Sequence, residues 1–215
     1  MKFSCEKALL LSAVNTASRA VSAKSSIPAL EGLLLEAETS LTVSGYNMQT
    51  GIRTHVSADV TEGGSLVLSA RLFGDMIRRL PDDVVVFSSD KNLNVKLTCG
   101  DASYDLTAIS SADYPDMPEV EDQFSFQIQQ KVLRAMIGET SFAVSTNEAR
   151  PVHTGSLFEI GEKGLTMVAV DGFRLALRRE PVERIDGGAF SFLAPGSPPG
   201  GGEKNCGDTD ELATV

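Results

Sequence analysis

Apolar residues recur along this chain with two spacings, one typical of helices and one typical of strands. Between residues 70 and 80 they return every three or four positions, which predicts an amphipathic helix. Similar spacing predicts helices over Lys7–Val21 and from about Gln130 onward. Short apolar runs between polar turns predict strands. These are Met1–Cys5, Leu33–Ala37, Leu41–Ser44, Gly51–Val60, Leu66–Leu68, Val84–Ser88, Leu93–Leu97, Tyr104–Ile109, Phe124–Ile128 and Phe190–Ala194.

Residues 165–178 predict a hairpin of two apolar strands joined through Asp171-Gly172. This dipeptide favours a tight two-residue turn, because such turns need residues that tolerate positive φ. Phe173, Arg174 and Leu175 follow at once, so we expect an aromatic ring, a guanidinium and an aliphatic group at the exposed start of a strand. The residue types alone fit a purely structural hairpin as well.

The chain carries an internal repeat. Pro28-x3-Gly32-x-Leu34-x-Glu36 returns 123 residues later as Pro151-x3-Gly155-x-Leu157-x-Glu159. Further matches at an offset of 124 are Leu41-Thr42 with Leu165-Thr166, Gly63-Gly64 with Gly187-Gly188, and Lys7, Leu9 and Thr16 with Lys131, Leu133 and Thr140. The copies therefore differ by one residue, which we place in the turn after Glu36 and Glu159. So long a period predicts duplicated domains, since solenoid repeats span only about 20–50 residues.

Each half of the first domain is predicted as a strand, a helix and three strands, which makes an α+β fold of antiparallel sheets with helices on one face. Ser110–Asp122 is acidic, contains two prolines and lacks periodicity, so it is predicted to be a linker. We expect domains at residues 1–118 and 119–215. The second is predicted to be incomplete, because Pro198–Gly202 cannot form the helix expected there.

Composition narrows the possible functions. The net charge of −10 disfavours general adhesion to nucleic acid or membrane, but leaves room for a local basic face. Cys5, Cys99 and Cys206 are widely spaced, so neither a disulfide framework nor a zinc site is predicted, and a reduced cytoplasmic setting fits. The N-terminus mimics a secretion signal, but Glu6 and the short apolar run Ala8–Val14 disfavour that interpretation. No segment is long enough to cross a bilayer.

Candidate chemistry is sparse, and no cofactor is predicted. His55 and His153 have no second ligand at metal spacing, and common catalytic motifs are absent. A small hydrolase using His153 and Asp171 is an alternative for which no nucleophile is apparent. The predicted helices and loops instead present basic residues that would suit the phosphates of duplex DNA, read without base specificity. These residues are Lys24, Arg71, Arg78, Arg79, Lys131, Arg134 and Arg150.

Six motifs along the chain are found together in one known family. They are Met1-Lys2-Phe3, Ile27-Pro28, Ala112-Asp113-Tyr114-Pro115, Arg150 with Gly155, Val168–Ala176, and Cys206–Asp210. Together they resemble the bacterial sliding clamps, the β subunits of DNA polymerase III, over nearly the whole chain. The resemblance implies the DNA-clamp fold, with three domains per chain and two chains closing head to tail around duplex DNA. It implies a non-catalytic processivity factor that tethers the polymerase to its template.

Matching positions in this family assign two sets of site residues. Those expected to approach duplex DNA are Lys24, Arg71, Asn147, Arg150, Pro151 and Val152. Those expected to form a pocket for short apolar peptides of the polymerase and clamp loader are His153, Val170, Gly172, Phe173, Arg174 and Leu175. Some family members carry aromatic DNA contacts where this chain has Pro151 and Val152.

The resemblance also implies that a third domain is absent from this chain. That domain would supply half of the peptide pocket and one side of each dimer interface. We therefore expect this chain not to close the head-to-tail ring and to hold peptides poorly. The alternative assembly is the trimeric clamp of archaea and eukaryotes, which has two domains per chain and would require an intact fourth helix.

Overall fold

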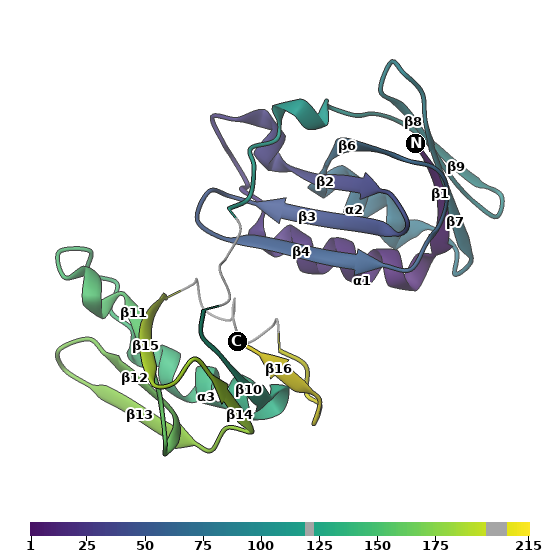
Figure 1. Cartoon of the computed structure of the whole chain (residues 1–215). Coiled ribbons are helices and arrows are strands. Elements are labelled where there is room, and N and C mark those ends of the chain that lie inside the picture. The colour runs from purple at the N-terminus through teal and green to yellow at the C-terminus, as the bar shows by residue number, and fades with distance from the viewer. Residues whose placement is uncertain (119–122, 197–205) are drawn as a thin grey trace. The chain divides into compact units, whose positions relative to one another are not determined.

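The computed structural model describes residues 1–118, 123–196 and 206–215 (Figure 1). The chain divides into two compact units, Met1–Glu119 and Val120–Val215. The helices in these described ranges are all too short or too polar to span a membrane. The expectation that Pro198–Gly202 interrupts a helix falls outside the described residues.

The first unit packs two helices against two antiparallel sheets. Its order is β1 (Lys2–Glu6), α1 (Lys7–Ala17), β2 (Gly32–Ala37), β3 (Leu41–Tyr46), β4 (Gly51–Val56), β5 (Asp59–Glu62), β6 (Gly64–Ser69), α2 (Ala70–Arg79), β7 (Val84–Ser89), β8 (Asn94–Cys99) and β9 (Ala102–Thr107). The sheets run β5-β1-β7-β8-β9 and β4-β3-β2-β6. Helices α1 and α2 cover one face of the second sheet (Figure 1). In the shared core Phe87 stacks on Phe3 and meets the ring of Phe73 edge to face.

One predicted strand divides into two. Gly51–Val60 was expected to be continuous, but β4 ends at Val56 and β5 begins at Asp59. The two pieces pair in different sheets, β4 with β3 and β5 with β1. The predicted turn over Thr61–Ser65 shrinks to Gly63 for the same reason, because the flanking residues extend to pair at the two sheet edges.

Helix α2 follows its apolar spacing with one exception. Phe73 and Ile77 are fully buried and Leu80, just after the helix, is nearly so. Leu72 was predicted on the same face but is 54% exposed. It lies in the first turn, where the Ser69 side chain accepts the Leu72 N–H at 3.5 Å and caps the helix.

The second unit repeats the beginning of this plan. Its order is β10 (Ser125–Gln129), α3 (Gln130–Thr140), β11 (Gly155–Gly161), β12 (Gly164–Val170), β13 (Leu175–Glu180), β14 (Arg184–Asp186), β15 (Phe190–Pro195) and β16 (Leu212–Thr214). Its sheets run β13-β12-β11-β15 and β14-β10-β16. Phe126, Met136 and Leu165 lie in its core. Among the described residues, β16 is the single strand that follows β15, in line with the one further strand expected.

Strand pairing confirms the repeat and locates the extra residue. Leu34 faces Ser44 between β2 and β3, and Leu157 faces Val168 at the same place between β11 and β12. Three residues separate the paired Ala37 and Leu41, whereas four separate Ile160 and Leu165. The additional residue therefore lies in the turn where it was predicted.

The matches assigned to the helices are wrong by one position. Helix α1 starts at Lys7 and α3 at Gln130, an offset of 123. Leu10 and Leu133 are the equivalent buried residues, whereas Leu9, which was matched to Leu133, is 45% exposed. Burial periodicity is the better guide here, because an isolated identity can arise by chance on a helix surface.

Gly74 lies inside α2, where it contacts α1. A Cβ atom there would lie 3.6 Å from Val14 Cγ1, which is ordinary van der Waals contact. Gly74→Ala should therefore raise the free energy of unfolding by about 0.5–1 kcal/mol, because alanine favours the helix. Urea unfolding measures this change. Gly45→Ala is the contrast, since its Cβ would collide with the Ala17 carbonyl oxygen and should destabilise the protein. Equal effects of the two substitutions would contradict this packing.

Candidate interaction sites

The hairpin of the second unit has a longer turn than predicted. Val170 pairs with Leu175, so four residues, Asp171–Arg174, form the loop instead of two. The Asp171 N–H donates to the Arg174 carbonyl at 3.3 Å. Gly172 has a φ of +95°, which confirms the expected positive φ at the glycine, whereas Asp171 does not share it. The sequence pair indicated a hairpin correctly but not its turn type.

The Asp171 carboxylate organises this loop. Its Oδ1 accepts the backbone N–H groups of Phe173 at 2.9 Å and Arg174 at 3.0 Å, and its Oδ2 accepts Arg174 Nε at 2.7 Å. The hydrogen bond from the Phe173 backbone, followed by those from Arg174, lowers the pKa of Asp171 below its ordinary value. A carboxylate held in this way is a weak base, which disfavours the hydrolase with His153. Within the described ranges, no three metal-ligating side chains come together.

The first unit contains a matching loop that sequence reasoning missed. Tyr46 pairs with Gly51 across Asn47–Thr50, and Asn47 Oδ1 accepts the N–H groups of Gln49 at 3.0 Å and Thr50 at 2.7 Å. Met48 has a φ of +71°, as Gly172 has a positive φ in the other loop. The signal in the sequence was Asn47, which lies 124 residues before Asp171.

Most of the expected peptide-pocket residues meet at this hairpin. Phe173 is fully exposed, Leu175 is 63% exposed, and Val170 is half-buried beside Leu175. The Arg174 guanidinium lies 5.7 Å from the centre of the Phe142 ring, a cation–π contact between the loop and the 3-10 turn Ser141–Ala143 that follows α3. His153 lies apart in sequence, half-buried in the turn Pro151–His153 before β11.

An apolar band crosses the outer face of the same sheet. Four residues face one another across β13, β12, β11 and β15, and all are half-buried or exposed. We call them the apolar band: Leu177, Val168, Leu157 and Leu193. The opposite face, which α3 contacts, buries Met167 and Ala169. The sequence predicted the hairpin residues but not this band, because alternation alone does not say what covers each face.

The expected DNA contacts of the first unit are exposed cations. Lys24 lies in the loop after α1, and Arg71 lies in the first turn of α2. Among the described residues neither forms an ion pair, whereas Arg78 pairs with Asp75 at 2.8 Å and Lys131 pairs with Asp210. The basic stripe expected from the sequence is therefore partly neutralised.

The expected DNA contacts of the second unit lie in one turn. Asn147 shapes it, since its Oδ1 accepts the Ala149 N–H at 3.0 Å and its carbonyl accepts the Arg150 N–H at 3.1 Å. Arg150 and Pro151 follow and are exposed, and Val152 is 67% exposed. The hydrogen bonds of Asn147 thus stabilise the turn, and Arg150, Pro151 and Val152 are the exposed residues at its end.

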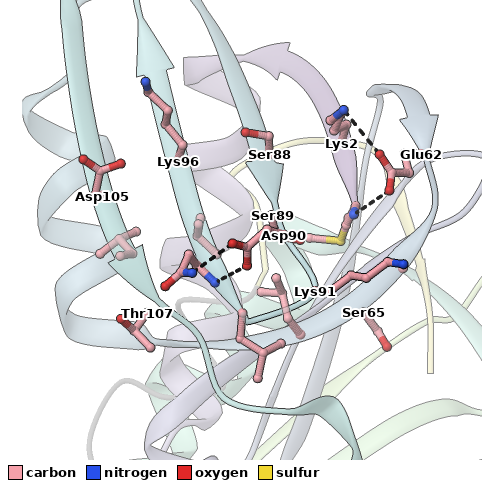
Figure 2. Close-up of a pocket in the computed structure, with 17 residues that line it drawn as sticks. Lys2, Glu62, Ser65, Ser88, Ser89, Asp90, Lys91, Lys96, Asp105 and Thr107 are labelled. Carbon is pink, nitrogen blue, oxygen red and sulfur yellow. Dashed lines mark hydrogen bonds and ion pairs between the residues drawn. The ribbon is translucent and has the colours of Figure 1, made fainter.

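A hollow of about 990 Å³ lies beside the N-terminus of the first unit (Figure 2). Glu62 contacts the terminal ammonium at 3.7 Å and Lys2 at 3.5 Å, while Asp90 accepts hydrogen bonds from Asn94 in the turn after β7. Figure 2 shows both interactions on the wall of the hollow. Its lining carries charges of both signs, so they indicate no single class of ligand.

The two units have the fold of sliding clamps. Over the whole chain the structure is similar to a putative DNA polymerase III beta subunit from Eubacterium rectale, with a TM-score of 0.94 and 29% identity, covering 59% of that chain. The sliding clamp of Bacillus subtilis is similar with a TM-score of 0.92 and 27% identity, again over 59% of its chain. Antiparallel sheets backed by a few helices, arranged in this way, define the DNA-clamp fold.

The family follows from the sequence comparison. Residues 1–118 match the N-terminal domain of the DNA polymerase III beta subunit, and residues 127–197 match its central domain. The chain belongs to the DNA polymerase III beta subunit family. The beta sliding clamp of Halalkalibacterium halodurans is 33% identical over 195 residues, which cover 86% of this chain and 51% of the relative. That of Bacillus subtilis is 27% identical over the full chain and 59% of the relative. The chain therefore spans about half to three-fifths of these relatives.

The bonding of Asp171 predicts how the loop responds to acid. Because its folded pKa is lowered, the stability it contributes is present above its unfolded pKa and is lost as pH falls through the folded value. NMR titration of the Asp171 carboxyl should give a pKa below that of an unperturbed aspartate. Arg174→Ala should raise it part of the way, since the backbone donors remain. Arg179→Ala removes an arginine bonded instead to Thr166 and should leave it unchanged. An equal response to both would contradict the assignment.

Proposed function

We propose that this chain acts in a bacterial DNA sliding clamp, with residues 1–118 and 119–215 as its N-terminal and central domains. In this role it is a non-catalytic subunit that holds duplex DNA without sequence preference and tethers the polymerase and clamp loader through short peptides. The observation that carries the proposal is the hairpin of the second unit. Phe173 and Leu175 project into solvent beside the apolar band, at the place that the family resemblance assigns to partner peptides.

The DNA-binding part of the proposal rests on exposed cations in an acidic protein. Within the described residues, Lys24, Arg71, Arg79 and Arg150 are exposed and form no ion pairs. Such side chains suit phosphate oxygens, which carry no sequence information. The net charge of −10 limits binding to the surface where these cations lie, and makes the interaction sensitive to salt.

The peptide-binding part of the proposal rests on apolar surface that is exposed to solvent. Burial of apolar surface contributes roughly 25 cal/mol per Å² removed from water. A peptide whose apolar side chains are covered on one side only therefore gains only part of this binding free energy. The cost of ordering the peptide is the same in either case. We propose that tight peptide binding and head-to-tail ring closure need parts of the family protein beyond the span that this chain matches.

Charge reversal tests DNA binding. Lys24→Glu with Arg71→Glu should lower the affinity for two unrelated duplexes alike, by about tenfold near 0.1 M salt, and should flatten the salt dependence by roughly two phosphate contacts. Fluorescence anisotropy measures both quantities. Lys91→Glu with Lys96→Glu makes the same charge change near the hollow and should have a much smaller effect. Strong preference for one duplex, or equal losses in both variants, would refute the proposal.

Alanine substitutions at the hairpin test peptide binding. Phe173→Ala and Leu175→Ala should each weaken a hexapeptide with adjacent leucine and phenylalanine residues by at least about threefold, as each removes apolar contact. NMR chemical-shift titration suits the low affinity expected. Leu212→Ala removes a comparably exposed leucine from β16 and serves as the control. Loss of binding only in the control would place the peptide elsewhere.

Sedimentation tests the assembly. If head-to-tail ring closure needs parts of the family protein beyond the span that this chain matches, the 22.9 kDa chain should sediment as a monomer at micromolar concentration. A short duplex that has room for one chain should not change this result. After the mass of the duplex is subtracted, the protein mass in the complex should still be that of one chain. A stable dimer would reveal another interface, and a stable trimer would favour the two-domain assembly in place of the proposed one.

A further inference from the structure

The outer face of the β4-β3-β2-β6 sheet is covered by the chain's own segment after β9. Tyr114 of this segment packs within an apolar cluster, and Met117 lies half-buried against the same cluster. Tyr114 is only 7% exposed although it lies in a region predicted to be a linker. The cluster, which we call the covered face, consists of Ala29, Leu30, Tyr46 and Val67.

The segment is attached to the sheet at two levels. Ile109 exchanges two backbone hydrogen bonds with Val67, at 3.0 and 2.8 Å, and the hydroxyl groups of Ser111 and Ser65 lie 2.8 Å apart. Beyond this attachment the contacts are made by side chains. Tyr114 enters the covered face, and Met117 lies so close to Gly51 that any Cβ at Gly51 would collide with its sulfur. The segment thus presents two apolar anchors three residues apart.

The second unit has the same face without such a cover among the described residues. Val152 is 67% exposed where Ala29 is 2% exposed, and Leu193 is 44% exposed where Val67 is fully buried. The matching turns before β2 and β11 and the strand registers establish the correspondence. The pairs are Ala29 with Val152, Leu30 with His153, Tyr46 with Val170, and Val67 with Leu193.

The cover of the first unit leaves a polar group unsatisfied. Among the described residues, Ser44 Oγ is buried without a hydrogen-bond partner. Ser44 is 1% exposed, and its counterpart in the second unit is the apolar Val168. A buried unpaired hydroxyl opposes the packing that surrounds it, because water would satisfy the group once the segment left. The contact is therefore weaker than its apolar area indicates.

We propose that the covered face is a second peptide-binding site, occupied here by the tethered ligand Tyr114–Met117. A separate peptide can replace this ligand if it carries an aromatic residue followed three positions later by an unbranched apolar residue. The aromatic ring of the peptide replaces that of Tyr114 between Leu30, Tyr46 and Val67, and its second apolar side chain lies against Gly51, as Met117 does here. This site is independent of the function proposed above, since it involves neither the basic residues nor the hairpin of the second unit.

The direct test releases the tethered ligand. Tyr114→Ser with Met117→Ser removes both anchors, and Asp113→Ser with Asp116→Ser, at exposed positions of the same segment, is the matched control. The probe is a fluorescent peptide of residues 109–118, followed by anisotropy. The release variant should bind one equivalent at least tenfold more tightly than the wild-type chain or the control. A peptide with serine in place of its tyrosine should not bind.

Two results would overturn the proposal. One is a release variant that keeps a cooperative unfolding transition but binds the peptide no better than the wild-type chain. The other is peptide binding that Leu193→Asp abolishes and Val67→Ala leaves unchanged, which would place the peptide on the second unit. Both results leave DNA binding untouched, so they are distinguishable from failure of the clamp function.

A second measurement keeps the aromatic anchor in place. Met117→Cys in a Cys206→Ser background supplies a half-buried thiol, while Cys5 and Cys99 are buried. Unlabelled peptide of residues 109–118 should raise the rate at which a thiol reagent modifies Cys at position 117, by at least about threefold at saturation, because it displaces the segment. The peptide with serine in place of tyrosine should not. An unchanged rate with the intact peptide would overturn the proposal even if the release variant fails to fold.

Discussion

Each four-stranded sheet of this protein has two faces with apolar side chains, and the helices of its own unit can cover only one of them. This constraint determines where apolar surface stays exposed to solvent. In the first unit Tyr114 and Met117 cover the second face, so that Tyr46 and Val67 are buried. In the second unit the equivalent face is left to solvent among the described residues, and Leu193 and Leu177 are about half exposed. The exposed apolar surface is thus a consequence of the architecture.

The hairpin loops show how a repeated backbone turn can carry different side chains. Asn47 and Asp171 accept the same two backbone N–H groups, and each loop has one residue with positive φ. Only the carboxylate also binds a guanidinium, which contacts the Phe142 ring in the turn after α3. The tip residue is Gln49 in one loop and the fully exposed Phe173 in the other. The same turn thus presents an exposed polar side chain in the first unit and an exposed aromatic side chain in the second.

Sequence patterns predicted much of this arrangement because periodicity reports burial. The helices, most strands, the repeat and the exposed hairpin residues were predictable in this way. The split between β4 and β5 was not, because it depends on which sheet edge each piece meets. Nor was the burial of Tyr114, which lies in an acidic, proline-containing stretch that reads locally as a linker. The four-residue loop was missed because its length depends on the Asp171 side chain, which accepts the N–H groups of Phe173 and Arg174, and not on the Asp-Gly pair alone.

Hydroxyl-radical footprinting with mass spectrometry measures the difference between the two sheet faces directly. Tyr and Phe react readily when exposed, so Tyr114 and Phe173 in one sample report on the two units under identical conditions. If one face is covered and the other bare, Phe173 and Leu193 should be modified quickly and Tyr114 slowly, after correction for intrinsic reactivity. Comparable protection of Tyr114 and Phe173, or faster modification of Tyr114, would contradict the account.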